Sequence, residues 1–388
     1  MSNTDKYIDF LKWCLDTSLD KPNCIDTINW HALLEFAMSQ AVIGIYWCGI
    51  KRLGKLKVNK PTDDDILEWM AAYKKIEKNN RKLNKVTSCV WNNFESENFD
   101  AVILKGQGNA TIYPDPFSRT SGDVDILVAP KFDKTLGVLS PKDNIKKVIR
   151  YCKNIFPGGK ACYHHIGFIK KEGIEIEVHY RASWLNNPWN NKRMQQFFRA
   201  GFKESMSIRV DLPENMGAIA IPSWNFNLIY QQAHILNHVM HFGVGLRQIV
   251  DYYYLLKSQT LKGQDFKKLI KALGLKGISE SLMWVLSEKL GLEDKYLISK
   301  SNEKSGRFLF DEILATGNFG HYDKRFLELF QLRNEYSVLK NNVIYRNVDR
   351  LIRDIRLFRY FPSECLWEPY FRIYHFFWRL RHNSLSRK

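Results

Sequence analysis

Two carboxylates, Asp123 and Asp125, alternate with apolar residues in the predicted strand 121–128. Successive side chains of a strand point to opposite faces, so the two aspartates share one face and Val124 and Ile126 pack on the other. Two anions this close raise each other's pKa, and both remain ionised at little cost only when positive charge lies between them. We therefore predict that the pair binds one or two divalent cations. Hard oxygen ligands favour Mg²⁺ or Mn²⁺ over Zn²⁺.

A third acid is expected from the predicted strand 173–180, whose strict alternation places Glu175, Glu177 and His179 on one face. Three carboxylates on neighbouring strands would form a metal site that polarises a phosphoryl group, and one of them could take the acceptor's proton. Glu175 and Glu177 are both candidates for this third acid, and Glu175 is more simply interpreted as a solvated residue at the strand end. His179 is left open between contact with a phosphate, support of Glu177 and simple packing.

A glycine turn precedes the first acidic strand, where the apolar residues 102–104 lead into Lys105 and Gly106. Gly106 allows a backbone N–H group to approach a triphosphate at the start of the short segment 107–113. Arg119 could equally hold a phosphate or form a structural ion pair. The candidate nucleotide-binding residues are Lys105, Gly106, Gln107, Arg119, Ser121 and His179.

These residues carry a resemblance to a known superfamily. A glycine turn, an Asp-x-Asp pair and a later strand acid resemble the pattern of the DNA polymerase beta-like nucleotidyltransferases. The fuller string is similar to one bacterial, largely uncharacterised nucleotidyltransferase family over roughly residues 25–260; it comprises Leu104-Lys105-Gly106, Tyr113-Pro114, Arg119, Gly122-Asp123-Val124-Asp125 and Glu177-Val178-His179. Gln107 stands where the superfamily usually has a second Gly or Ser, and the spacing from the turn to the aspartates is longer than in the polymerases.

The resemblance implies a Mg²⁺-dependent enzyme with Asp123 and Asp125 as metal ligands, Glu177 as the third acid, and Gly106 with Gln107 as the phosphate turn. The expected reaction moves a nucleoside monophosphate from a nucleoside triphosphate, first of all ATP, to an acceptor hydroxyl or phosphate, and releases pyrophosphate. The acceptor is a small molecule, a protein or RNA. Two alternatives are a phosphotransferase that uses the same nucleotide site and a non-catalytic nucleotide- or RNA-binding protein with a degenerate site.

The length of 388 residues exceeds what one core usually holds, so we expect several regions. Helical periodicity dominates both ends of the chain, and strand patterns lie between them. We predict an α+β fold with a small mixed β-sheet of the nucleotidyltransferase type, flanked by N- and C-terminal helical regions. The predicted regions are an N-terminal helical region (1–95), a catalytic core (96–215), a helical domain (216–330) and a basic aromatic helical tail (331–388). In this tail, aromatic side chains at helical spacing favour core packing over contact with RNA or a membrane.

The formal net charge of +17 favours an anionic partner, but it does not select among nucleotides, RNA and an acidic membrane surface. The seven cysteines are scattered and include no Cys-x-x-Cys pair, which suits reduced thiols in a cytosol. The N-terminus lacks the pattern of a signal peptide, and the longest apolar run, 41–50, is too short to span a bilayer. We therefore expect a cytoplasmic protein without a transmembrane segment.

Overall fold

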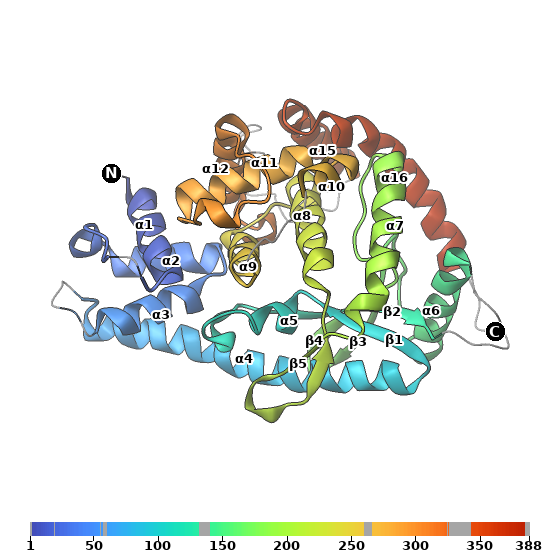
Figure 1. Ribbon diagram of the computed structural model, residues 1–388, viewed down its shortest axis with the longest axis horizontal. Helices are drawn as coiled ribbons and strands as arrows, with labels where there is room; N and C mark the ends of the chain where they lie inside the picture. Colours follow the sequence, from blue (N-terminus) through green and yellow to red (C-terminus); the bar gives the residue numbers. More distant parts are fainter. Residues whose placement is uncertain are drawn as a thin grey trace. The chain divides into compact units, whose positions relative to one another are not determined.

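The computed structural model describes residues 2–18, 20–54, 56, 60–131, 140–259, 266–323, 325 and 343–384. The chain forms two compact units, each built from separated stretches. The first unit contains 1–73, 185–187 and 232–368, and the second contains 74–184, 188–231 and 369–388. Helices with a small mixed sheet confirm the predicted α+β class (Figure 1). The predicted border between 330 and 331 lies outside the described residues, and the division into four regions stays a prediction.

The second unit contains a four-stranded sheet in the order β1-β2-β4-β3 (Figure 1). Its strands are β1 (Phe99–Leu104), β2 (Asp123–Pro130), β3 (His165–Lys171) and β4 (Ile174–His179). The two central strands, β2 and β4, are parallel, and each edge strand is antiparallel to its neighbour. A separate two-stranded ribbon joins β5 (Arg209–Asp211) to β6 (Ala218–Ala220).

One face of this sheet forms the core of the second unit. Val124 and Ile126 are buried there, as the alternation of β2 predicts. The same core includes side chains of α4 (Asp63–Ser96), α6 (Pro141–Ile155) and α16 (Pro362–Asn383). Ser140 starts α6 as its N-cap, because its hydroxyl accepts a hydrogen bond from the Asp143 N–H group. Burial of the apolar face leaves the acidic residues of β2 on the opposite face.

The polar face of the sheet meets two helices of the second unit. The short helix α5 (Gly106–Ala110) follows β1 directly. The first part of α8 (Trp224–His241) contacts α5, where the Asn227 amide donates to the Asn109 side chain at 3.2 Å. The unit also contains α7 (Pro188–Ser205), which the sequence analysis did not predict.

Helix α16 has two aromatic faces in its second half. Phe371 and Trp378 are buried in the core of the second unit. Tyr370 and Phe377 lie on the other face, where 55% and 63% of their surfaces are exposed. The expected core packing of the aromatic tail therefore holds for one face of this helix only.

The first unit is helical in its described residues. Besides parts of α4, α8 and α16, it contains α1 (Asn3–Leu15), α2 (Trp30–Ser39), α3 (Ile43–Leu53), α9 (Leu246–Lys257), α10 (Phe266–Ala272), α11 (Lys276–Trp284), α12 (Glu303–Thr316) and α15 (Val343–Phe358). Aromatic side chains form much of its core: the ring centroid of Phe10 lies 5.5 Å from that of Trp30 and 5.8 Å from that of Tyr46. Gly49 of α3 lets this helix pack closely against α1, because a Cβ atom at this position would collide with Cys14.

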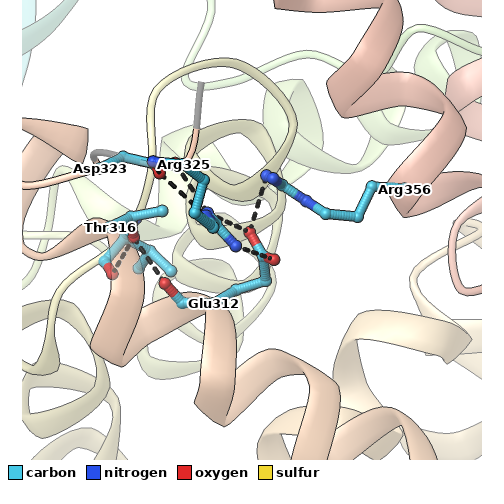
Figure 2. A network of polar contacts seen from close by, with 6 residues as sticks. Glu312, Thr316, Asp323, Arg325 and Arg356 are labelled. Atoms are coloured by element: carbon cyan, nitrogen blue, oxygen red, sulfur yellow. Dashed lines mark hydrogen bonds and ion pairs between the residues drawn. The ribbon is translucent and has the colours of Figure 1, made fainter. Parts of the chain in front are cut away.

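A buried carboxylate connects α12 to α15 inside the first unit (Figure 2). The two oxygens of Glu312 accept hydrogen bonds from Arg325 at 2.7 and 3.1 Å, and Arg356 donates to one of them at 3.1 Å. Arg325 also binds Asp323 at 2.7 Å. Because of these ion pairs, Glu312 can remain charged although only 5% of the residue is exposed.

A search for membrane-crossing segments over the described residues finds no helix with the length and apolar character that a bilayer requires.

Candidate active site

The parallel pairing of β2 with β4 brings the predicted acids together in the second unit. Asp123 lies opposite Glu175, and Asp125 lies opposite Glu177. The Glu177 side chain is one-third exposed, so it stands at the surface of the site and does not turn into the interior. Glu175 is 63% exposed and binds Lys170 at 2.7 Å, a solvated position. Asp123, Asp125 and Glu177 are thus neighbours on the polar face of the sheet.

Asp125 is buried between two cationic side chains. Its Oδ2 atom lies 2.9 Å from Lys105 Nζ, and its Oδ1 atom lies 2.8 Å from His179 Nε2. Burial alone would raise the pKa of Asp125, but the Lys105 charge and the hydrogen bond from His179 hold it well below its usual range. Asp125 is therefore ionised although only 2% of the residue is exposed.

His179 contacts two of the three acids. Its Nε2 atom, 2.8 Å from Asp125, also lies 3.6 Å from Glu177 Oε2. Burial opposes protonation, yet the hydrogen bonds to both carboxylates raise the pKa of His179 to about 9. The imidazole is therefore a cation at neutral pH. Of the three roles left open by the sequence, this geometry matches support of the acids.

The turn after β1 supplies the second cation. Lys105 and Gly106 both have positive φ angles, 49° and 44°, and the turn directs the Lys105 ammonium toward Asp125. Burial of Lys105 opposes its charge, but the negative charges of Asp125 and Asp123 outweigh this effect and raise its pKa. A lysine with φ in this region is uncommon, because the Cβ atom crowds the backbone.

Residues 26–291 match the model of a family described as uncharacterised nucleotidyltransferase. The chain belongs to this nucleotidyltransferase family. The crystal structure of an antigenic nucleotidyltransferase-like protein from Paracoccidioides brasiliensis aligns at 17% sequence identity with a TM-score of 0.33, over 55% of this chain and 94% of that chain. No curated protein matches the chain.

Asparagines of α4 fasten the start of α5 and the loop that leads into Asp123. The Gln107 side chain is buried and donates a short hydrogen bond to Asn84. Asn80 donates to the carbonyl of Arg119 at 2.8 Å, and Asn79 donates to the carbonyl of Ser121 at 2.8 Å. The sequence analysis missed this role of α4, although Asn80 and Asn84 stand one helical turn apart.

Arg119 and Ser121 contact each other in the loop before Asp123. The Arg119 guanidinium donates to the Ser121 hydroxyl at 2.6 Å, and only 4% of Arg119 is exposed. Both side chains therefore help to hold the loop that leads into Asp123. The structure places Lys105 and His179 at the carboxylates, and it places the Gln107 side chain toward α4.

Two further residues of the site were not predicted from the sequence. The Nδ1 atom of His165 lies 3.3 Å from Glu177 Oε2, and burial with the nearby His179 charge lowers the pKa of His165 to about 4. Tyr230 of α8 is buried next to Lys105. His165 lies opposite His179 in the antiparallel pair of β3 and β4. The hairpin pattern of the sequence could therefore have indicated that His165 lies near the acids. No local pattern links Tyr230 to the turn after β1.

Proposed function

We propose that this nucleotidyltransferase transfers a nucleoside monophosphate from a nucleoside triphosphate, with ATP as the first candidate, to an acceptor hydroxyl or phosphate, and releases pyrophosphate. The observation that carries the proposal is the grouping of Asp123, Asp125 and Glu177 on two adjacent parallel strands. The acceptor is a small molecule, a protein or RNA. The seven free thiols suit the cytoplasmic location that belongs to the same proposal.

The donor set fits a hard divalent cation, Mg²⁺ or Mn²⁺. All three side chains offer carboxylate oxygens, the ligands these ions prefer. Each oxygen of Asp125 has a cationic contact, yet a carboxylate oxygen has two acceptor sites and retains one for a metal. Asp123, Asp125 and Glu177 would hold the ion, which when bound neutralises phosphate charge and polarises the phosphoryl centre.

The other groups of the site have separate tasks in this proposal. The exposed carboxylate of Glu177 accepts the proton of the acceptor hydroxyl. Lys105 offers an ammonium group to the phosphates, while His179 keeps Asp125 and Glu177 oriented. The backbone at Gly106 and Gln107 seats the triphosphate, and Arg119 with Ser121 holds the loop before Asp123.

ATP labelled at either the α- or the γ-phosphate tests the reaction. Metal-loaded protein is incubated with each label and with separate pools of protein, RNA and small hydroxyl compounds. We expect label from the α-phosphate on an acceptor, with pyrophosphate released, and a loss of at least about a hundredfold in Asp123→Asn. Label retained from the γ-phosphate would show phosphotransfer instead. If neither label is retained and Asp123→Asn binds Mg²⁺ and ATP as the wild type does, the protein is a non-catalytic binder.

A further inference from the structure

A second group of metal-ligating side chains lies just before β3. Cys162, His164 and His165 come from four consecutive residues, and one ligand atom of each lies within 4.8 Å of the others. The Cys162 Sγ atom is 3.4 Å from His164 Nδ1, and His164 Nε2 is 2.9 Å from His165 Nδ1. Only one nitrogen of His164 can bind a given ion, so the candidate donor set is defined by the mutual limit of 4.8 Å, a range from which small side-chain shifts reach the spacing around a tetrahedral ion.

The backbone that carries these donors is fixed on several sides. The Cys162 N–H group donates to the carbonyl of His165 at 2.8 Å. The N–H groups of Tyr180 and Arg181 both donate to the carbonyl of His164, at 3.0 and 3.1 Å. The Tyr180 hydroxyl donates to the carbonyls of Cys162 and His165. A segment held in this way presents its side chains in a preorganised arrangement, which metal binding favours.

The surroundings of the sulfur suit a thiolate ligand. The backbone N–H groups of His164 and His165 both hydrogen-bond to the Cys162 sulfur, and such bonds stabilise negative charge. Burial nevertheless raises the pKa of the Cys162 thiol, so these two donors alone do not ionise it. A bound cation would complete the stabilisation, because a coordinating thiol is deprotonated outright.

The ring of His164 is also held in place by packing. Its centroid lies 4.2 Å from that of Trp184 and 4.3 Å from that of His165. His165 Nδ1 faces Glu177 Oε2 at 3.3 Å in addition to His164 Nε2. Two lone-pair-bearing atoms therefore face His165 Nδ1, and a cation stabilises such a group better than one shared proton does.

We propose that Cys162, His164 and His165 bind a transition-metal ion of the Zn²⁺ class, at a site separate from the oxygen ligands Asp123 and Asp125. Sulfur and imidazole donors select Zn²⁺ over Mg²⁺. Three protein ligands leave the fourth position for water. This inference does not rest on the proposed reaction, because it concerns a different ion and a different donor set.

Cobalt substitution tests the site through its colour. The full-length protein is stripped of metal and titrated with Co²⁺, which takes Zn²⁺ positions and absorbs in the near ultraviolet when a thiolate binds it. We expect a thiolate-to-Co²⁺ band that saturates at one equivalent and disappears when one equivalent of Zn²⁺ is added. Cys162→Ser removes the band, and His164→Gln or His165→Gln weakens Co²⁺ binding by at least about tenfold.

Two controls separate this site from the others. Cys48→Ser, a half-buried cysteine of the first unit, keeps the band. Asp123→Asn also keeps it, although the same variant is expected to lose nucleotidyl transfer, so the two proposals fail independently. A wild type without the band, a band that survives in Cys162→Ser, or Co²⁺ binding that depends on Glu177 and not on Cys162 would overturn the inference. Circular dichroism shows whether each variant is folded, and the two histidine variants decide the question if Cys162→Ser is not.

Discussion

At the scale of single residues, the charge of Asp125 is compensated from within the protein. Lys105 and His179 each contact a different oxygen of this carboxylate. A buried carboxylate without such partners would take up a proton and lose its value as a metal ligand. Both cations thus keep Asp125 ionised without the help of a metal ion.

Glu177 and Glu175 form a matched pair for testing the proposed proton transfer. Both lie on the same face of β4, but only Glu177 is next to Asp125 in the sheet register. We expect Glu177→Gln to lower the turnover of α-labelled ATP by about 10²–10⁴-fold, because the amide neither accepts a proton nor carries charge. Pyrophosphate release is the measurement.

Glu175→Gln is the control, since its side chain is solvated and paired with Lys170. It should retain turnover within about twofold, because exposed ion pairs contribute little free energy. Equal losses in the two variants would mean that charge along β4, and not the position of Glu177, determines activity.

A different carboxylate, Glu364 in the first unit, predicts how stability depends on pH. Burial raises the pKa of Glu364 to about 7, although its Oε2 atom accepts a 2.6 Å hydrogen bond from the Asn186 N–H group. The folded state therefore binds more protons than the unfolded state between the ordinary pKa of 4.5 and about 7. The free energy of unfolding should fall as pH rises through this window, by an amount on the order of 3 kcal/mol, and change no further above it.

Glu364→Gln isolates this effect because the amide keeps an acceptor for Asn186 and does not titrate. Urea unfolding at a series of pH values should show a flatter profile for the variant, and above pH 7 the variant should be at least as stable as the wild type. A variant profile parallel to that of the wild type would contradict the assignment to Glu364.

Part of the candidate site was predictable from the sequence because strand alternation is a local property. Alternation alone is enough to place Asp123 with Asp125, and Glu177 with His179, on one face of their strands. Lys105 was predicted only as a weak candidate, since nothing local shows that its ammonium meets Asp125. Alternation from the start of the hairpin would place His164 and His165 on opposite faces, but His164 precedes β3 and its ring contacts that of His165, so the alternation rule does not apply to it. Tyr230 reaches the site through tertiary packing alone.

At the scale of elements, the turn between β1 and α5 is the strained connection of the site. Lys105 and Gly106 both have φ angles in the left-handed region. Gly106 tolerates this geometry at no steric cost, because it has no Cβ atom. Lys105 adopts this geometry while its ammonium pairs with Asp125 at 2.9 Å.

Replacement of Gly106 by alanine should therefore destabilise the fold. The added Cβ atom meets little, since the carbonyl oxygen of Asp123 at 3.8 Å is the nearest atom, so the cost comes from the positive φ and should be about 1–2 kcal/mol. Gly122→Ala is the matched control: no atom lies within 4 Å of its added Cβ, and its φ is outside the left-handed region. Chemical denaturation of both variants measures the difference, and equal stability would show that the turn relaxes.

The elements themselves were predicted where periodicity was long and regular. The sequence pattern predicts helices from about 62 to 93 and from about 141 to 156, and the structure has α4 (Asp63–Ser96) and α6 (Pro141–Ile155) there. Helix α7 was missed because the tryptophans and amides of 184–191 resemble a loop, although Pro188 suits the first turn of a helix. Which face of α16 would be buried was also hidden, because both of its faces are aromatic.

At the scale of the whole molecule, the second unit is completed by a distant part of the sequence. Phe371 and Trp378 of α16 pack in the same core as β2 and β4. Lys153 donates to the carbonyls of His382 and Asn383 at 3.1 and 2.8 Å, and the Asn383 side chain pairs with the backbone of Ala161. These contacts fasten the end of α16 to α6 and to the segment before β3.

Trp378 and Phe377 are adjacent aromatic residues that test this arrangement. Trp378→Ala should lower the free energy of unfolding by about 3–5 kcal/mol, because it opens a cavity in the core. Phe377→Ala removes a side chain from a residue that is 63% exposed and should change stability by less than about 0.5 kcal/mol. Thermal or urea unfolding compares the two, and a similar loss in both would show that the exposed face is covered in solution.

The position of α16 also bears on how the protein is made. A ribosome synthesises the strands and their acids long before residues 369–383 emerge. The core on this face of the sheet therefore cannot be completed until the end of α16 has been synthesised. During that interval the apolar surface that Phe371 and Trp378 later cover faces water, and the nascent protein is open to chaperones and proteases. A fragment limited to residues 96–215 would lack this helix permanently, which makes it a poor choice for producing the predicted catalytic core by itself.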